Sequence, residues 1–212
     1  MPRCQDARQD HDTPQGQDPS LPELMALIRQ CRVCSPHLSH VPNPVVRAES
    51  PAARLMVIGQ APGTRVHATG IPWNDPSGER LRDWLGLDPA IFYDQTKVAI
   101  MPMGFCYPGK GKGGDLPPRP ECAPLWHDRI WSGLSAIELT LLIGRYAQER
   151  YLGTKIKRSL TETVQAWRDY LPLGFIPLVH PSPRNRLWLR RNPWFEAEIV
   201  PFLRHRIAGM KL

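Results

Sequence analysis

The chain has 212 residues, 42% of them hydrophobic, and a formal net charge of +7. This length and composition predict a soluble globular protein and exclude fibrous and wholly disordered classes. No stretch approaches the roughly 18 uninterrupted apolar residues of a membrane span, and the polar first residues lack the apolar core of a secretory signal. We therefore expect a cytoplasmic protein (nucleoid-associated if bacterial) with no membrane partner. The positive charge fits a polyanionic partner if it gathers on one face.

Residues 1–19 are polar and predict a disordered tail ahead of a single domain at 20–212. Apolar runs and helical stripes predict, in chain order, a helix near 20–31, a strand at 55–58, a helix at 76–87, a strand at 98–101, a helix near 126–134, a strand at 138–143, a helix at 159–170, a strand at 175–179 and a helix at 194–209. Strands that alternate with helices are typical of parallel sheets. The predicted fold class is therefore α/β, a three-layer α/β/α sandwich with a central four-stranded, mostly parallel sheet.

Two polar motifs directly follow predicted strands. Gly59-Gln60-Ala61-Pro62-Gly63 comes after the strand at 55–58, and His180-Pro181-Ser182-Pro183 comes after the strand at 175–179. In open α/β sheets the carboxyl ends of the strands meet at one edge, and ligands bind in the crevice outside it. The two motifs therefore predict an active site at this edge.

The first motif belongs to a longer pattern, which continues into Gly70-Ile71-Pro72-Trp73 and then Pro76-Ser77-Gly78. This order and spacing resemble the first conserved motif of the uracil-DNA glycosylase superfamily. The resemblance is closest to the thermophile-type (family 4-like) iron–sulfur branch, with Gln60 in place of Glu and Trp73 in place of Phe. The motif at His180 resembles the same family's His-Pro-Ser segment. The chain therefore looks like a divergent member of that superfamily.

The resemblance covers roughly residues 24–205 and implies an enzyme that flips uracil out of DNA and hydrolyses its N-glycosidic bond, leaving an abasic site. By resemblance Trp73 supplies the stacking face for the base, and the alternative is a core or lid residue. The family usually reads the uracil edge with an asparagine on the second strand, which the segment 98–106 lacks. Backbone groups or Asn74 then read the base, and hypoxanthine or xanthine remains open as a substrate. The residues implied in base binding are Gly59, Gln60, Ala61, Trp73 and Asn74.

Breaking the glycosidic bond leaves positive charge on the sugar and negative charge on the base, so the reaction calls for a group that orients water and a donor to the base. By resemblance His180 donates to uracil O2. Two side chains are candidates for the group that orients the water. His67 stands three residues before Gly70, where several branches have Asp, and its neutral imidazole can position water. Asp75 is the nearby carboxylate, and its alternative role is to cap the helix at Pro76. We favour His67 slightly.

Positive charges gather after the His180 motif. Arg184, Arg186, Arg190 and Arg191 lie within eight residues, and with Trp188 nearby they predict a phosphate-contacting, intercalating loop. The Gly-rich segment at 109–114 adds two lysines and is predicted to contact DNA phosphates, and a simple solvated loop is the alternative. The residues expected to contact DNA are Ser182, Pro183, Arg184, Asn185, Arg186, Lys110 and Lys112.

Four cysteines form two spaced pairs, Cys31-x-x-Cys34 and, with fifteen residues between them, Cys106 and Cys122. In a chain of this class, spaced pairs favour metal binding over disulfides. The thermophile-type glycosylases hold a 4Fe–4S cluster with cysteines in this order and with similar gaps, so the resemblance implies such a cluster here. A Cys₄ zinc site or free thiols are the alternatives.

The resulting hypothesis is a monomeric, monofunctional glycosylase acting on uracil in single- or double-stranded DNA. Three alternatives remain: a nucleic-acid-binding protein with a degenerate pocket, a glycosylase for another deaminated base, and a small-molecule N-ribosyl hydrolase. The basic segment 184–191 disfavours the last one, because a free nucleoside needs no phosphate contacts.

Overall fold

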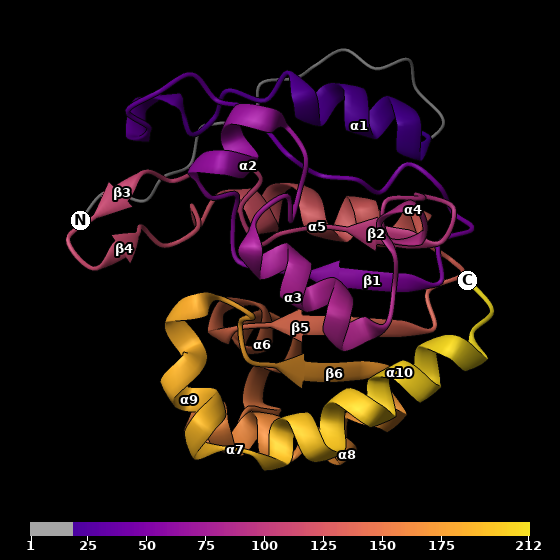
Figure 1. The fold of residues 1–212 in the computed structure, drawn as a ribbon. Coiled ribbons are helices and arrows are strands. Elements are labelled where there is room, and N and C mark those ends of the chain that lie inside the picture. The colour runs from indigo at the N-terminus through magenta and orange to yellow at the C-terminus, as the bar shows by residue number, and fades with distance from the viewer. Residues whose placement is uncertain (1–18) are drawn as a thin grey trace.

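The computed structural model describes residues 19–212. Of the tail predicted at 1–19, all but Pro19 lies outside the described residues. The central sheet is parallel throughout and has the strand order β2-β1-β5-β6 (Figure 1). Its strands are β1 (Leu55–Ile58), β2 (Val98–Ile100), β5 (Leu139–Ile143) and β6 (Phe175–Leu178). The four predicted strands are thus confirmed within a residue at each end.

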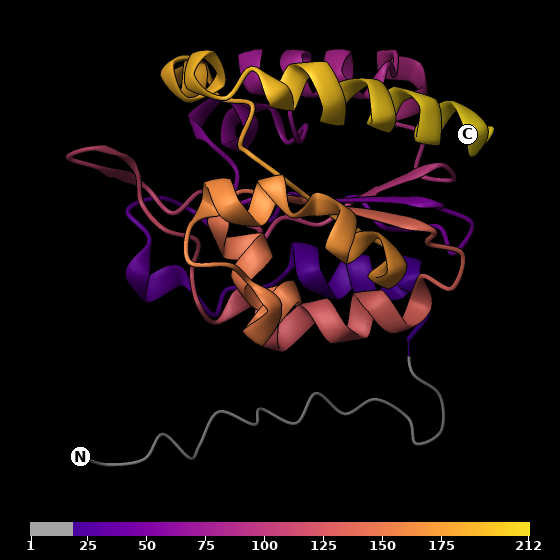
Figure 2. The same ribbon diagram turned by 90° about the horizontal axis from the view of Figure 1, so that it is seen from below.

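Helices cover both faces of this sheet, which confirms the three-layer sandwich (Figure 2). One face carries α3 (Pro76–Leu85) and α10 (Val200–Gly209), and the other carries α1 (Leu21–Arg29), α5 (Cys122–Gly133) and α6 (Arg145–Leu152). The short helices α7 (Leu160–Gln165) and α8 (Trp167–Tyr170) pack beside β6. No helix among residues 19–212 is long and apolar enough to cross a membrane.

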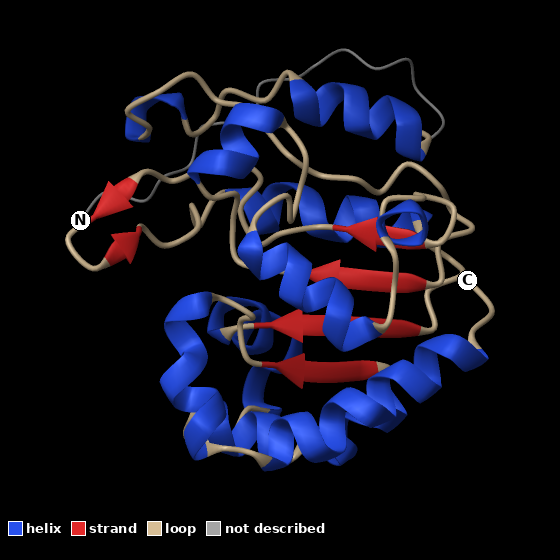
Figure 3. Cartoon of the chain, viewed as in Figure 1, coloured by secondary structure: helices blue, strands red, loops and turns tan. Residues whose placement is uncertain are grey.

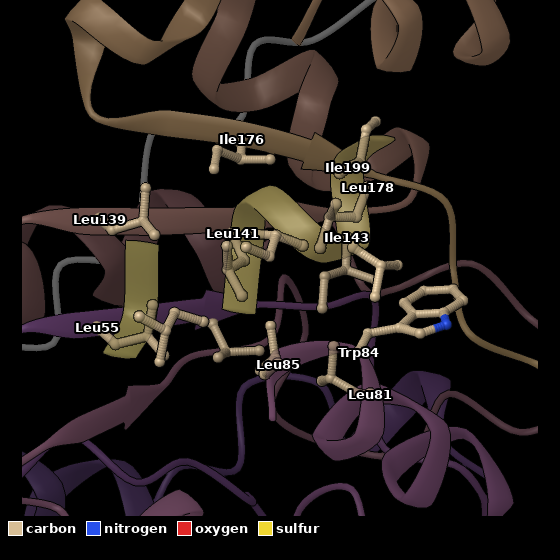
Figure 4. Packing of buried hydrophobic residues seen from close by; sticks show 14 of the residues in the cluster. Leu55, Leu81, Trp84, Leu85, Leu139, Leu141, Ile143, Ile176, Leu178 and Ile199 are labelled. Carbon is tan, nitrogen blue, oxygen red and sulfur yellow. The ribbon is translucent and has the colours of Figure 1, made fainter. Parts of the chain in front are cut away.

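The core has two halves because successive strand residues point to opposite faces. Leu55 and Val57 pack with α3 and α10, whereas Met56 and Ile58 pack with α1 and α5. Figure 4 shows the first half, where the side chains of α3 point toward those of the strands. Every residue of β1, β2 and β5 is buried, as expected for strands covered on both sides. The sheet is therefore a rigid platform for the loops at its edge.

Several helices differ from the sequence prediction. The helix predicted at 159–170 is interrupted at Ala166 and forms α7 and α8. The helix predicted at 194–209 begins as a π-helical turn, Phe195–Ile199, before α10, because Pro201 has no N–H to continue the α-helical ladder. The prediction also missed four short helices, α2 (Thr64–Thr69), α4 (Pro89–Phe92), α6 and α9 (Arg186–Arg191). Within residues 19–212 the remaining helical elements are 3₁₀ turns: Ser35–His37, Gly153–Lys155, Leu171–Leu173 and η4 (Pro183–Asn185).

A small antiparallel hairpin interrupts the long loop after β2. It consists of β3 (Lys110–Gly111) and β4 (Gly114–Asp115), and it stands apart from the central sheet (Figure 3). In Figure 1 the strand arrows of the sheet point toward the side of the molecule where this hairpin and α9 lie. The hairpin therefore belongs to the carboxyl edge of the sheet.

The connections diverge between β1 and β5. The chain runs from β1 to β2 on one side, then returns across to β5 and β6 on the other. Such a switch in direction opens a crevice at the carboxyl ends of the strands, the usual ligand site of open α/β sheets. The loop after β1 and the loop after β6, which carry the two sequence motifs, both emerge at this edge.

Candidate active site

A pocket lies at the switch point and is built from the loops after β1, β2 and β6. It encloses about 430 Å³, the open space at its mouth included, which is within the usual range for small-ligand sites. The residues that line it are Val45, Gly59, Gln60, Ala61, Pro62, Gly63, Val66, Pro72, Trp73, Asp75, Ile100, Pro102 and His180. Six of the predicted site residues therefore share one pocket: Gly59, Gln60, Ala61, Trp73, Asp75 and His180.

Trp73 is fixed in the pocket by two glycines. Its backbone has a φ of 57°, which is uncommon for a bulky residue. A Cβ on Gly59 would lie 2.7 Å from Cζ2 of the indole, and a Cβ on Gly78 would overlap the Trp73 carbonyl oxygen. The same carbonyl accepts a hydrogen bond from Arg82 at 3.2 Å. Strained backbone held from several sides is typical of functional sites, and the half-buried indole packs on the core while one side faces the pocket.

His180 stands opposite this indole, with the two ring centroids 5.4 Å apart. Its Nδ1 accepts a hydrogen bond from the backbone N–H of Ser182 at 3.2 Å. A neutral imidazole with a proton acceptor at Nδ1 carries its proton on Nε2. Burial lowers the pKa of His180 below its ordinary value, and the nearby Asp75 carboxylate offsets part of this effect. At neutral pH the residue is therefore an uncharged imidazole with an Nε2–H donor.

Asp75 both caps α3 and lines the pocket. One carboxylate oxygen accepts the backbone N–H of Gly78 at 2.8 Å, so Asp75 is the N-cap of α3, with Pro76 at the first helical position. The half-buried side chain also lines the pocket and interacts electrostatically with His180. The capping role considered from the sequence is thus confirmed, and it places a carboxylate in the pocket.

The loop after β1 turns its carbonyl groups away from the pocket. The carbonyls of Gly59 and Gln60 accept hydrogen bonds from the N–H groups of Met103 at 2.9 Å and Gly104 at 3.0 Å. The N–H groups of Gln60 and Ala61 have no acceptor among residues 19–212. Unpaired backbone donors beside a pocket are suited to bind acceptor atoms of a ligand.

One wall of the pocket is apolar, formed by Val45, Ile100 and Pro102. Pro102 lies two residues after the end of β2, and a buried histidine that carries no sequence signal holds it in place. Nε2 of His127, on α5, donates a hydrogen bond to the Pro102 carbonyl at 3.1 Å, and Nδ1 lies 2.7 Å from the Tyr151 hydroxyl. Burial lowers the pKa of His127 to about 4, so it is neutral and positions the wall. Its sequence context, inside an amphipathic helix, gives no signal of this role.

Two predicted residues lie elsewhere. His67 of α2 does not line the pocket, and its ring packs against His40 and Tyr107, with centroid distances of 4.4 and 5.9 Å. Burial and the neighbouring His40 lower the pKa of His67. Asn74 is half-buried and also outside the pocket lining. Of the two candidates for orienting water, only Asp75 reaches the pocket.

The predicted DNA-contacting residues flank the pocket mouth. Pro183, Arg184, Arg186 and the two lysines of the β3–β4 hairpin, Lys110 and Lys112, are exposed. Two others stabilise the loop itself: Asn185 donates to the His180 carbonyl at 2.8 Å, and the Ser182 hydroxyl accepts the N–H of Arg184 at 3.2 Å. Hydrogen bonds within the loop after β6 therefore hold it in a defined conformation, and its basic side chains are exposed.

Trp188 differs from its prediction as part of an intercalating loop. Its indole N–H donates to Thr161 at 2.8 Å, and its ring packs edge-to-face against Trp194 and Phe195. Two edge-to-face ring contacts and a satisfied indole N–H favour this packed position over one exposed to water. Trp188 is thus a structural residue that anchors α9 to the core.

The four cysteines of the two predicted pairs line a second cavity, together with Pro42, Pro44, Phe105, Arg119 and Trp126. This cavity encloses about 340 Å³, the open space at its mouth included. Burial and the neighbouring thiols raise the pKa of Cys106 to about 11 and that of Cys122 to about 12. With pKa values this high, the thiols would be deprotonated only with a bound cation to stabilise the thiolates. The backbone N–H of Phe105 donates a hydrogen bond to the sulfur of Cys122 at 3.3 Å.

The spacing of these thiols bears on the group they could hold. No three Cys, His, Asp or Glu side chains in the described part of the chain are close enough to hold one metal ion. A single zinc with bonds of about 2.3 Å would draw its thiolates to roughly 4 Å from one another. Four thiols around one cavity are the donor set that a 4Fe–4S cluster needs. The indole N–H of Trp126, which also lines the cavity, is buried with no acceptor among the described residues.

The sequence matches a model of one protein family over the part of the chain that contains this fold and pocket. The model is described as the uracil DNA glycosylase superfamily, and it matches residues 47–204, about three quarters of the chain. The matched region includes the whole sheet and every predicted residue that lines the pocket. Membership indicates a DNA glycosylase that acts as a hydrolase. The chain belongs to the uracil DNA glycosylase superfamily.

Proposed function

We propose that this protein is a monomeric, monofunctional uracil-DNA glycosylase, which hydrolyses the N-glycosidic bond of deoxyuridine in DNA. One observation carries the proposal. A neutral imidazole with its donor on Nε2 shares a pocket with a fixed indole and a loop of unpaired N–H groups. These are a charge-stabilising donor, a stacking face and edge-binding donors, which a base-excising enzyme needs.

The reaction proceeds with the base flipped into this pocket, stacked on Trp73 and held at its edge by the N–H groups of Gln60 and Ala61. The bond between C1′ and N1 breaks, and its electron pair leaves with the uracil. His180 donates a hydrogen bond to the uracil oxygen where negative charge develops, and this interaction strengthens in the transition state. Water adds to the cationic C1′ and loses a proton, and the uracil anion takes up a proton. Free uracil and an abasic site result.

Asp75 is the group in the pocket that can orient this water and stabilise the sugar cation. We expect Asp75→Asn to lower the rate of uracil release by about 10²-fold, because the charge is lost while asparagine remains a good N-cap. The melting temperature should stay unchanged. Asp88→Asn is the matched control, since Asp88 caps α4 before Pro89 in the same way but is exposed.

If Asp75→Asn keeps full activity while His67→Ala loses it, His67 orients the water, and the pocket must rearrange when DNA binds.

The apolar wall of Val45, Ile100 and Pro102 favours a second candidate, a glycosylase for hypoxanthine or xanthine, because no side-chain amide reads the base from this side. A substrate panel separates the possibilities. Oligonucleotides with a single uracil, hypoxanthine or xanthine, single-stranded and in duplexes, are compared with free deoxyuridine. We expect the fastest release from uracil-containing DNA and none from the nucleoside. Faster release of a deaminated purine would favour the second candidate.

We further propose that Cys31, Cys34, Cys106 and Cys122 hold a 4Fe–4S cluster with a structural role. When bound, the cluster would be held by the four cysteine thiolates and would join the N-terminal segment to the loop after β2. Anaerobically purified protein is expected to contain about four iron and four sulfide ions per chain, with visible absorption that Cys122→Ser abolishes. One equivalent of zinc, or no metal after reconstitution with iron and sulfide, would contradict the cluster.

A further inference from the structure

The β3–β4 hairpin and the loop after the pocket histidine are in direct contact. A Cβ on Gly114 of β4 would lie 2.6 Å from the Arg184 guanidinium, so this side chain rests on the hairpin backbone. Gly114 and Arg184 are 70 residues apart in the chain (184 − 114) and belong to two basic segments that the sequence alone leaves unrelated. The fold brings these segments together at the carboxyl edge of the sheet (Figure 1).

The hairpin is tied to the body of the protein. The Tyr107 hydroxyl, itself buried, donates to Asp115 at 3.4 Å. Leu116 packs on the hairpin glycines, 3.6 Å from a Cβ on Gly109 and 3.0 Å from one on Gly111, and its N–H donates to the Gly109 carbonyl at 2.9 Å. These contacts give the hairpin a defined position, and Arg184 can be seated on it.

The charges at this place are mostly of one sign. Lys110 and Lys112 of the hairpin, with Arg184 and Arg186 beyond the pocket, are all exposed, and none forms an ion pair within residues 19–212. Asp115 is the carboxylate of the hairpin, and it points to Tyr107. Unpaired cations on two neighbouring elements have the sign to attract a phosphate backbone.

We propose that the hairpin, η4 and the first residue of α9 form one phosphate clamp that binds the DNA backbone beside the pocket. The clamp consists of Lys110, Lys112, Gly114, Arg184 and Arg186. Gly114 is its positioning residue, because only a residue without a side chain lets the guanidinium of Arg184 lie on the hairpin. The inference rests on the proposed function for its partner, DNA. It adds that the hairpin acts through Arg184 and is not a separate contact.

The test measures binding and needs no base excision. The probe is a fluorescein-labelled duplex with a tetrahydrofuran abasic-site analogue, titrated at several salt concentrations. We expect Lys110→Ala/Lys112→Ala to make the slope of log K against log salt shallower by about 2. An unchanged slope would remove the hairpin from the DNA interface. Competition by RNA or an acidic protein at equal strength would contradict a DNA partner.

A double-mutant cycle tests the coupling between the hairpin and Arg184. Arg184→Ala and Gly114→Ala should each weaken binding by about five- to tenfold, and the double variant should be no weaker than either single one. Gly113→Ala is the matched control, because nothing lies within 4 Å of a Cβ there. Multiplicative losses in the double variant, or equal binding by Gly114→Ala and Gly113→Ala, would overturn the clamp. Clamp binding without uracil release would instead count against the proposed activity alone.

Discussion

His180→Ala is expected to lower the rate of uracil release by about 10²- to 10³-fold, the loss typical for removal of one preorganised donor to a developing anion. The Nε2–H of His180 is fixed by the hydrogen bond at Nδ1, and the pocket keeps the ring neutral. A neutral donor binds the departing anion more strongly than it binds the intact base, so its loss affects the chemical step. Single-turnover rates on a uracil duplex measure this effect.

The pH profile of the wild type gives an independent readout of His180. Burial lowers its pKa below the ordinary value of 6.5, so the neutral form persists as the pH falls through 6.5. We expect the single-turnover rate to stay level from pH 8 to 6.5 and to fall only at lower pH. A rate that rises on acidification would mean that the protonated imidazole is the active form.

His205→Ala is the control for the His180 variant, since His205 is exposed on α10. It should keep the wild-type rate. His180→Ala should also keep its affinity for the abasic-analogue duplex, because the basic loops remain. Wild-type rates in His180→Ala would refute the assigned role.

Gly59→Ala is the second substitution with a large expected effect. Its methyl group would lie 2.7 Å from Cζ2 of Trp73, and the indole has little room to yield because the Trp73 backbone is packed against Gly78. A displacement of about 1 Å in a substrate-positioning group costs roughly 10²-fold in rate. We therefore expect uracil release to fall by about that factor, with the fold retained. Circular dichroism and single-turnover kinetics on the same samples separate the two effects.

Gly209→Ala is the control, because this residue lies outside the site. Gly209 is exposed at the end of α10, and nothing lies within 4 Å of a Cβ there. This variant should keep nearly the wild-type rate. If the two alanine variants behave alike, the close packing of Gly59 on Trp73 has no catalytic importance.

The sheet was predictable because its strands are short apolar runs that are buried on both faces. Three of the missed helices lack the signals on which prediction depends, whereas α4 has an Asp88 N-cap but is only four residues long. Gly63 and Gly144, which precede α2 and α6, provide no side-chain cap. Helices as short as α2 and α9 show less than two turns of periodicity, so their buried residues do not form a recognisable stripe.

The pocket was predictable where the chain supplies consecutive motif residues. Gly59, Gln60, Ala61, Trp73, Asp75 and His180 come together because parallel strands deliver their loops to one edge. His67 illustrates the limit. It stands at a plausible distance along the loop, but the chain forms α2 there, and the helix turns the ring toward His40 and Tyr107. An unrecognised helical turn was enough to change which side chain reaches the pocket.

Long-range support was beyond the reach of sequence patterns. His127 fixes the Pro102 wall from a different helix, and Arg184 rests on a hairpin 70 residues earlier in the chain (184 − 114). Neither residue type carries a motif for such a contact. These positions depend on tertiary packing and are read only from the folded protein.

The stoichiometry of products from a duplex with one deoxyuridine tests the proposed uracil-DNA glycosylase activity most directly. Free uracil is quantified by mass spectrometry, and abasic sites are quantified by alkaline strand cleavage in the same reaction. We expect one free uracil for each abasic site with the wild type, and neither product from His180→Ala over the same time. Tight binding of the uracil duplex without free uracil would contradict the glycosylase activity and identify a binding protein with an inactive pocket.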